Sequence, residues 1–370
     1  MKPLRIAMMS LTHGHSRKYY QTLRENKKLD WVAACAEDDQ ALNVFRLYEK
    51  DVPCYLSAEE MFEKHPEIEA VVIASSNDRH LDQLSDCARR GIHILMMKIP
   101  SFDLAEYDQM IAQVRDAGIV CQVELELHYN PVVRRLKELV ASGELGRVLS
   151  IQATNITLSP VWAFPWQGVP EVSYGSRMPL RDGDARFRGG ALCDHPHAFD
   201  LIRHLTGAEF ELIHAEVGPN LRQDLEVEDM MLANGRMTDG SVFLIDPSWS
   251  RMEERLTVPG PGWEVFPKRM EVNVTVVGEK GTIACDCFGP NVYHNGGPND
   301  RYTVQYTYFD EWIGMIDEFV DCIRHQRQPL INLEWHRPTI ETMNACYDSI
   351  QARQPVRLES AGAVGEGNRD

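Results

Sequence analysis

Short apolar runs alternate with amphipathic stretches over about the first 125 residues of the chain. An apolar run followed by an amphipathic stretch is typical of a βα unit, and a series of such units builds a parallel sheet. The predicted strands are Arg5–Ser10, Trp31–Ala36, Ala70–Ser75, His93–Met97 and Val120–Glu124. Capping-box spacings at Ser57/Glu60 and Asp103/Glu106 predict helices that run to His65 and to about Ala117. We therefore expect a doubly wound α/β Rossmann domain over residues 1–125.

Longer runs with twofold alternation begin near Arg147. Such alternation is typical of an antiparallel sheet with one buried face. The runs are Val148–Leu158, Phe210–Val217, Ser241–Trp249, Arg269–Val277 and Thr303–Tyr308, and the predicted helices are Ala198–Leu205 and Trp312–Arg324. These patterns predict an α+β domain with a large, mainly antiparallel open sheet over residues 126–358. The weakly periodic segment Pro160–Phe187 is predicted as a long loop, and residues 359–370 as a disordered tail.

Composition narrows the class of protein. The 370 residues, 44% of them hydrophobic, suffice for two cores. No run of about 18 apolar residues or signal peptide is present, which predicts a cytoplasmic protein with no membrane partner. The nine cysteines are scattered, and Cys285 and Cys287 alternate with Asp286, which indicates two reduced thiols on one strand face. A net charge of −17 without a basic cluster disfavours nucleic acid and favours a small-molecule ligand.

In an open α/β sheet the ligand lies beyond the carboxyl ends of the strands, so the residues that follow each strand are informative. The first predicted strand ends in a segment where a dinucleotide-binding fold carries G-x-G-x-x-G. Here only one glycine is present, at a position where the fingerprint requires none. The candidate pyrophosphate loop consists of Ser10, Thr12, His13, Gly14 and His15. A plain polar turn is the alternative.

The second and third strands also end in polar residues. Glu37, with no arginine beside it, is the candidate for the adenosine ribose, which favours NAD over NADP. Its alternative is a solvated acidic turn. Ser75, Asn77 and His80 are placed to line the nicotinamide ribose or, alternatively, to cap the next helix.

Two further segments carry titratable groups. Lys98 follows the fourth predicted strand and places an ammonium at the mouth of the sheet, unless it is an ordinary surface lysine. The second segment opens with two glycines and leads into a predicted helix, and its candidates are Asp194, His195 and His197. A polar helix cap with solvated histidines is the alternative. No fourth ligand is evident and the segment turns directly into a helix, so we predict no metal site.

Together these motifs resemble the Gfo/Idh/MocA family of sugar and polyol oxidoreductases, over almost the whole chain. The matching segments are Ala70–His80, Met97–Pro100, Asn130–Arg147, Gly189–Gly190 with Asp194, His197 and Asp200, Gly278–Thr282, and Trp312–Arg324. Three features depart from the family pattern. Ser10, Thr12 and His15 replace the fingerprint glycines; Met97 and Ile99 stand where the family has glutamate and proline; and the aspartate precedes the histidine by three residues instead of four.

The resemblance implies NAD(P) bound between the two domains and hydride transfer to or from a hydroxyl-bearing carbon of a sugar, polyol or glycoside. Lys98 corresponds to the family lysine and His197 to its histidine. His197 would act as base, Lys98 would stabilise the developing alkoxide, and Asp194 would orient His197 or bind a neighbouring hydroxyl. The expected substrate-binding residues are Lys98, His128, Trp162, Trp166, Asp194, His195 and His197.

The resemblance also implies a homodimer or homotetramer formed through the exposed face of the second sheet. Two other functions stay open from the sequence. One is an NAD-dependent glycosidase or lyase that oxidises its substrate transiently. The other is a cofactor-binding regulator without turnover.

Overall fold

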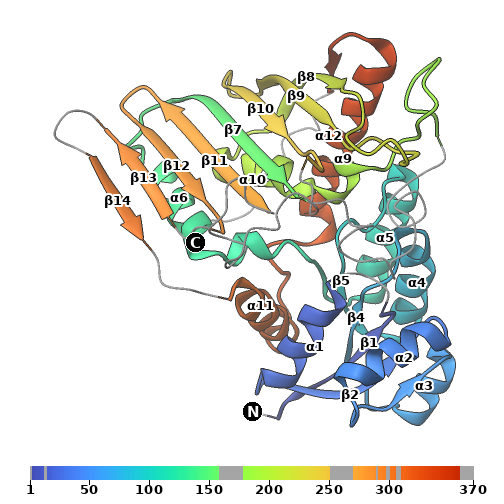
Figure 1. Cartoon of the computed structure of the whole chain (residues 1–370). Helices are drawn as coiled ribbons and strands as arrows, with labels where there is room; N and C mark the ends of the chain where they lie inside the picture. The colour runs from blue at the N-terminus through green and yellow to red at the C-terminus, as the bar shows by residue number, and fades with distance from the viewer. Residues whose placement is uncertain are drawn as a thin grey trace, which may run out of the picture.

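The computed structural model describes residues 2–11, 15–157, 178–250, 270–288, 291–296, 301–305 and 310–358. Their backbone forms two sheets (Figure 1). The first is a six-stranded parallel sheet in the order β3-β2-β1-β4-β5-β6, which is the strand order of a dinucleotide-binding fold. Its strands are β1 Leu4–Met9, β2 Leu29–Cys35, β3 Cys54–Tyr55, β4 Ala70–Ile73, β5 His93–Met96 and β6 Cys121–Val123.

Helices connect these strands and cover both faces of the sheet. They are α1 Ser16–Glu25, α2 Asp39–Tyr48, α3 Ala58–Lys64, α4 His80–Arg90 and α5 Leu104–Ala117, with short 3₁₀ helices η1 Asn77–Arg79 and η2 Glu126–Tyr129. Both predicted caps are confirmed: the Ser57 hydroxyl accepts a hydrogen bond from the Glu60 N–H, and the Asp103 carboxylate accepts from the Glu106 N–H. Each cap satisfies a backbone donor that the first helical turn leaves unpaired.

The second sheet has nine strands, in the order β14-β13-β12-β11-β7-β10-β9-β8-β15. They are β7 Val148–Ile156, β8 Phe210–Val217, β9 Met231–Met237, β10 Val242–Asp246, β11 Glu271–Gly278, β12 Thr282–Asp286, β13 Asn291–Asn295, β14 Arg301–Gln305 and β15 Val356–Arg357. The β10–β7 pair is parallel and the other pairs are antiparallel. The predicted α/β class, a Rossmann sheet plus a mainly antiparallel sheet, is confirmed.

The remaining helices pack between and beside the two sheets. They are α6 Pro131–Ala141, α9 Ala191–Asp194, α10 Pro196–Thr206, α11 Glu311–His325 and α12 Leu333–Ala352. α6, α10 and α12 contact strands of the nine-stranded sheet. α11 returns to the first sheet, where Trp312 and Phe319 join the same buried cluster as Tyr19 and Leu23 of α1 (Figure 1). Helix α11 lies between β14 and β15 in the chain, yet its side chains contribute to the core of the first sheet.

Several boundaries differ from the sequence prediction. β10 ends at Asp246 instead of Trp249. The elements that were not predicted are β3, β9, β13, β15, α6 and α12. Parts of three predicted strands, Leu158, Arg269 and Tyr306–Tyr308, lie outside the described residues. Residues 160–177 of the predicted loop and the tail 359–370 also lie outside them. The predicted thiol pair is confirmed as two buried, free cysteines at 285 and 287. Within the described part of the chain, no helix has the length and apolarity needed to cross a bilayer.

Candidate active site

Lys98 and Asp194 meet where the two sheets face each other. Lys98 follows β5 and Asp194 ends α9, so the pair joins the parallel sheet to the second one. The Lys98 ammonium lies 2.7 Å from the Asp194 Oδ1 and donates a second hydrogen bond, of 2.5 Å, to the Asp194 carbonyl. Both residues are buried. The alternative of an ordinary surface lysine is wrong, because the Lys98 ammonium is held in an interior ion pair.

The second carboxylate oxygen of Asp194 is also engaged. Trp249 donates its indole N–H to the Asp194 Oδ2 at 2.9 Å, and His195 Nε2 lies 3.4 Å from the same atom. Burial raises the pKa of Asp194, but the charge of Lys98 and these polar contacts outweigh burial, so the pKa lies well below its ordinary value. Asp194 is therefore an anion that fixes the position of the lysine head group.

His195 is part of the wall of the site. Its Nδ1 lies 2.6 Å from the Pro247 carbonyl and its Nε2 lies 3.1 Å from the Thr157 hydroxyl. Burial lowers the pKa of His195, which keeps the ring neutral. A neutral ring with Nδ1 as donor satisfies both contacts, so His195 connects α9 to the ends of β7 and β10.

His197 lies one residue into α10 and faces a different carboxyl group. Its Nε2 is 3.8 Å from Glu126 Oε1, on η2. Burial, and after it the positive charge of Lys98, lower the pKa of His197 well below its ordinary value. The imidazole is therefore neutral at pH 7, as a general base must be. The sequence prediction offered Asp194 as a residue that could orient His197; the carboxyl group found beside that ring is Glu126.

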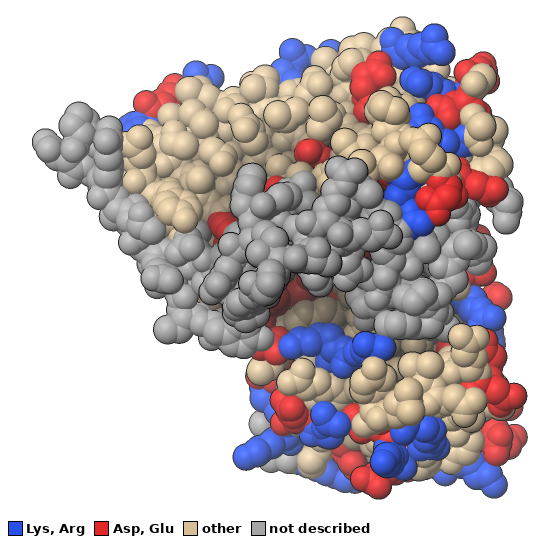
Figure 2. Space-filling view, in the orientation of Figure 1, with Lys and Arg blue, Asp and Glu red and all other residues tan. Residues whose placement is uncertain are grey.

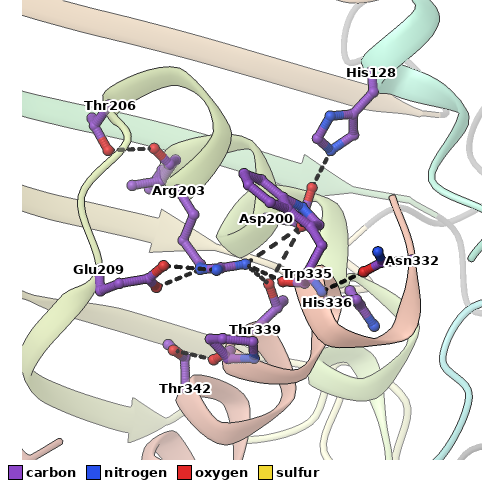
Figure 3. Close-up of polar contacts among 12 residues, drawn as sticks. His128, Asp200, Arg203, Thr206, Glu209, Asn332, Trp335, His336, Thr339 and Thr342 are labelled. Atoms are coloured by element: carbon purple, nitrogen blue, oxygen red, sulfur yellow. Dashed lines mark hydrogen bonds and ion pairs between the residues drawn. The ribbon is translucent and has the colours of Figure 1, made fainter. Parts of the chain in front are cut away.

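A buried polar cluster holds α10 in place (Figure 3). Asp200, one turn after His197, forms a hydrogen bond with Nε2 of His128 on η2 and accepts a 3.2 Å hydrogen bond from the Trp335 indole of α12. His128 stacks edge-on against His204, with ring centroids 4.2 Å apart. The prediction of His128 as a substrate ligand is untested, and its observed partner is Asp200. The cluster positions His197 by fixing the helix that carries it.

Backbone conformation and close packing explain the two glycines that precede α9. Gly189 adopts φ 113°, and a Cβ on Gly190 would lie 1.8 Å from the Glu228 carbonyl oxygen. The Glu228 carboxylate accepts the Gly190 N–H, and the Tyr347 hydroxyl donates to it at 2.7 Å. This close approach of backbone to backbone places the turn that leads to Asp194.

The carboxyl edge of the first sheet carries the candidate cofactor residues. Glu37, after β2, accepts the Leu11 N–H at 2.9 and 3.0 Å on its two carboxylate oxygens, which brings it to the end of β1. Ser10 takes the left-handed backbone conformation, φ 70°, at the position of the first fingerprint glycine. The Ser10 hydroxyl is buried without a hydrogen-bond partner.

The three candidate residues after β4 differ in their contacts. Asn77 has both amide atoms buried without a hydrogen-bond partner, as expected for a group that awaits a ligand. The Ser75 hydroxyl donates to Gln83 at 2.6 Å. His80 is fully buried; its Nδ1 lies 2.9 Å from the Pro100 carbonyl and its Nε2 lies 3.2 Å from the Ser75 carbonyl. It thus links β4 to the loop that carries Lys98.

Five predicted residues lie outside the described residues: Thr12, His13, Gly14, Trp162 and Trp166. His15, at the end of the first candidate loop, is described, and its Nδ1 lies 2.9 Å from Glu124 Oε1. On this face of the molecule Figure 2 shows a hollow between the parts built on the two sheets, with acidic side chains inside it. Among the described residues, no group of three or more His, Cys, Asp or Glu side chains could hold a metal ion.

Sequence reasoning missed three residues of the site. Glu124 and Glu126 follow β6, the fifth predicted strand, and the rule that residues after each strand face the ligand points to them as it points to Lys98. Trp249 sits after β10 and carries no such signal, because its contact with Asp194 arises only when α9 packs on the second sheet.

Comparison with known proteins identifies the family. Residues 6–125 match the model described as "Oxidoreductase family, NAD-binding Rossmann fold", and residues 133–284 match "GFO/IDH/MocA C-terminal domain". The chain belongs to the Gfo/Idh/MocA oxidoreductase family. One relative is the myo-inositol 2-dehydrogenase of Thermotoga maritima, 22% identical over 302 residues, which are 80% of this chain and 81% of the relative.

Solved structures share the fold of this chain. The aldose-aldose oxidoreductase of Caulobacter crescentus, in complex with glycerol, superposes with a TM-score of 0.74 at 19% identity, covering 96% of this chain and 100% of that one. A putative NADPH-dependent oxidoreductase from Desulfitobacterium hafniense gives a TM-score of 0.78 at 17% identity, covering 96% and 98%. At these identities the likeness shows the fold alone.

Proposed function

We propose that this chain is an NAD-dependent dehydrogenase that transfers a hydride between nicotinamide and a hydroxyl-bearing carbon of a sugar, polyol or glycoside. The observation that carries the proposal is the 2.7 Å Lys98–Asp194 ion pair, buried near the neutral imidazole of His197. A cation and a neutral base are the two groups that oxidation of an alcohol requires of the protein.

Each group has one task in this proposal. Lys98 donates a hydrogen bond to the substrate hydroxyl and stabilises the negative charge that develops on its oxygen. His197 removes the hydroxyl proton. Asp194 holds the ammonium in place and keeps its charge compensated before substrate binds. The burial of all three residues excludes water, which strengthens these electrostatic interactions.

The residues along the first sheet fit a dinucleotide. The unpartnered Ser10 hydroxyl and Asn77 amide provide hydrogen bonds for a ligand that crosses the carboxyl ends of β1 and β4. Glu37 would receive the adenosine ribose hydroxyls. Its carboxylate would repel a 2′-phosphate, which supports NAD as the cofactor over NADP. When bound, NAD supplies the hydride acceptor.

The names of relatives support the substrate class. Myo-inositol and aldoses are the substrates named for the two relatives above, and both are polyhydroxylated molecules without a phosphate. The net charge of −17 agrees with a substrate that is not a polyanion.

The test is a turnover assay with purified protein. We expect NADH absorbance to rise when NAD is mixed with at least one member of a panel of aldoses, inositols and glycosides. His197→Asn should lower kcat by about 10²–10⁴-fold and leave NAD affinity unchanged, because it removes only the base. Glu144→Gln, an exposed change, serves as the control.

Other outcomes would replace the proposal. Release of cleavage products without accumulated NADH would assign the chain to a lyase or glycosidase that oxidises its substrate transiently. Binding of NAD without turnover of any substrate would indicate a regulator. Failure to bind either nucleotide would refute both enzymatic functions.

A further inference from the structure

Two buried carboxyl groups that follow β6 each have an oxygen without a hydrogen-bond partner, and one of them, Glu126, lies beside His197. Glu124 is 0% exposed and Glu126 is 7% exposed, and the Oε2 atom of each is unpartnered. A buried carboxyl oxygen left without a donor is costly, and most buried polar atoms in folded proteins have a partner in the protein, in ordered water or in a ligand.

A third unpartnered group lies close to these carboxyl groups. The Tyr19 side chain is fully buried and its hydroxyl has no hydrogen-bond partner. Its ring packs edge-on against Trp312, with centroids 4.9 Å apart, and Trp312 also contacts the ring of His15, at 5.4 Å. Because His15 Nδ1 lies 2.9 Å from Glu124 Oε1, a chain of contacts through Trp312 and His15 links the Tyr19 ring to Glu124.

The carboxyl groups in this region disfavour one another's ionisation. Burial raises the pKa of Glu126, and the neighbouring charges of Glu124 and Glu311 raise it further. After burial, Glu124 and Glu126 also raise the pKa of the Tyr19 hydroxyl, so all three groups act on one another. Lys98 is near enough to oppose this effect on Glu126, but its ammonium is bound to Asp194.

The chemistry of these atoms selects a type of ligand. A nearby cation favours the ionised form of Glu126 that its surroundings disfavour. An ionised carboxylate only accepts hydrogen bonds, and a phenol oxygen can accept as well. A primary ammonium has three donors and a positive charge, so it could satisfy several of these oxygens and relieve the repulsion between Glu124 and Glu126. A hydroxyl has one donor and no charge to offer.

We propose that Glu124, Glu126 and Tyr19 form an acidic subsite beside His197 that binds a protonated primary amine of the substrate. The substrate is then an amino sugar or aminocyclitol whose ammonium lies near the carbon that is oxidised. This inference rests on the proposed dehydrogenase function, and it makes Glu126 a determinant of substrate specificity.

The experiment compares matched ligands that differ only in the amino group. The neutral ligands are D-glucose and myo-inositol, and the amines are D-glucosamine, 3-amino-3-deoxy-D-glucose and an amino-deoxy-inositol. N-acetyl-D-glucosamine keeps the nitrogen but removes its charge. Binding is measured by calorimetry with saturating NAD near neutral pH, and turnover is measured by NADH absorbance in the same samples.

We expect at least one amine to bind about tenfold or more tightly than its neutral partner, a difference of about 1.4 kcal/mol or more, since its ammonium forms charge-assisted hydrogen bonds. Glu126→Gln should abolish this preference, because it keeps the size of the side chain and removes its charge. Glu144→Gln makes the same change at an exposed site and should leave the preference intact. Acetylation of the amine should abolish it in the wild-type protein, a comparison that needs no variant.

Equal or weaker binding of every amine would refute the proposed subsite. If the neutral ligands alone were then oxidised, the dehydrogenase function would still be supported. An amine preference that depends on Glu126, without NADH formation from any ligand, would support the subsite and refute the dehydrogenase. Loss of NAD affinity in Glu126→Gln with an unchanged amine preference would assign Glu126 to the cofactor and overturn the proposal.

Discussion

At the scale of single residues, the Lys98–Asp194 pair connects function to stability. The ammonium and the carboxylate lie 2.7 Å apart in the interior, and the indole of Trp249 binds the other carboxylate oxygen. Removing one member of a buried pair leaves the other charge uncompensated. A variant of either residue therefore affects folding as well as chemistry, and a test must separate the two effects.

Lys98→Met keeps the length of the side chain and removes its charge. We expect kcat to fall by about 10²–10³-fold, because one stabilising group is lost from the reacting oxygen. The free energy of unfolding should fall by about 3 kcal/mol, since Asp194 stays buried and charged. Adding Asp194→Asn should restore most of this stability and none of the activity. NADH formation and urea denaturation measure the two effects; a double variant no more stable than Lys98→Met would contradict the pairing.

Ser10 offers a prediction about the backbone. Its φ of 70° costs a residue with a Cβ about 1–2 kcal/mol, and glycine avoids this cost but loses more entropy on folding. We expect Ser10→Gly to raise the free energy of unfolding by roughly 0.5–1 kcal/mol. Arg353→Gly, at φ 53° after α12, is the matched control away from the cofactor edge. If Ser10→Gly alone is destabilising in thermal melts, the serine hydroxyl contributes an interaction of its own.

At the residue scale, the sequence predicted the position of side chains that follow a strand of the first sheet, and their roles stay predictions. Lys98 and Asn77 were found in this way, and both lie at the carboxyl edge of the sheet. Glu126 obeys the same rule but was overlooked. The partner of each side chain was not predictable, because Lys98 and Asp194 are 96 residues apart and meet only through the packing of α9.

At the scale of elements, α10 and α12 share the buried cluster around Asp200 (Figure 3). Arg203 of α10 donates to the Trp335 carbonyl of α12 at 2.9 Å and to the carboxylate of Glu209. His336 of α12 lies 3.0 Å from the Tyr107 hydroxyl of α5, so the cluster also reaches the first sheet. α12 escaped prediction because its buried positions include polar residues: His336, Thr339, Thr342 and Ser349. Such residues interrupt the apolar period that identifies an amphipathic helix.

The histidines of this cluster predict a pH dependence of stability. Burial lowers the pKa of His204 to about 3 and that of His336 to about 4, whereas the unfolded value is about 6.5. Because the folded values are the lower ones, the unfolded state takes up protons first as the pH falls. Each histidine should therefore remove about 1.4 kcal/mol of stability per pH unit below about 6.5, until its own folded pKa is reached.

The measurement is urea denaturation at about pH 7, 6 and 5, for the wild type and for His204→Gln. We expect a shallower loss of stability in the variant. Comparing the two proteins is necessary, since burial raises the pKa of Glu228 to about 7 and this group contributes the opposite slope over the same range. Parallel curves for the two proteins would refute the assignment to His204.

At the scale of the whole molecule, the nine-stranded sheet exposes apolar side chains on the face away from its helices. Leu232 of β9 is 51% exposed, and Val242 and Leu244 of the neighbouring β10 are 50% and 42% exposed. A contiguous exposed apolar patch is typical of an interface between proteins. We propose a second copy of this chain as the partner, in a homodimer or homotetramer.

Leu244→Lys should break this assembly, because it places a charge in a desolvated interface. We expect the molar mass from light scattering to fall toward that of one 42.2 kDa chain. Leu47→Lys makes the same change on α2, in the domain built on the first sheet, where the leucine is 75% exposed. This control variant should leave the molar mass unchanged. A wild-type protein that is already monomeric would disprove the proposed interface.

The sequence by itself determined the class of fold, because apolar periodicity and helix caps are local properties that report which face of each element is buried. It also determined the family and which strand ends carry polar side chains. Only the tertiary structure decided which of those side chains meet. Lys98 with Asp194, His197 with Glu126 and His128 with Asp200 are contacts between separate elements, and their distances depend on how the two sheets and α10 pack together. Packing of this kind is a property of the whole core, and no local pattern in the chain encodes it.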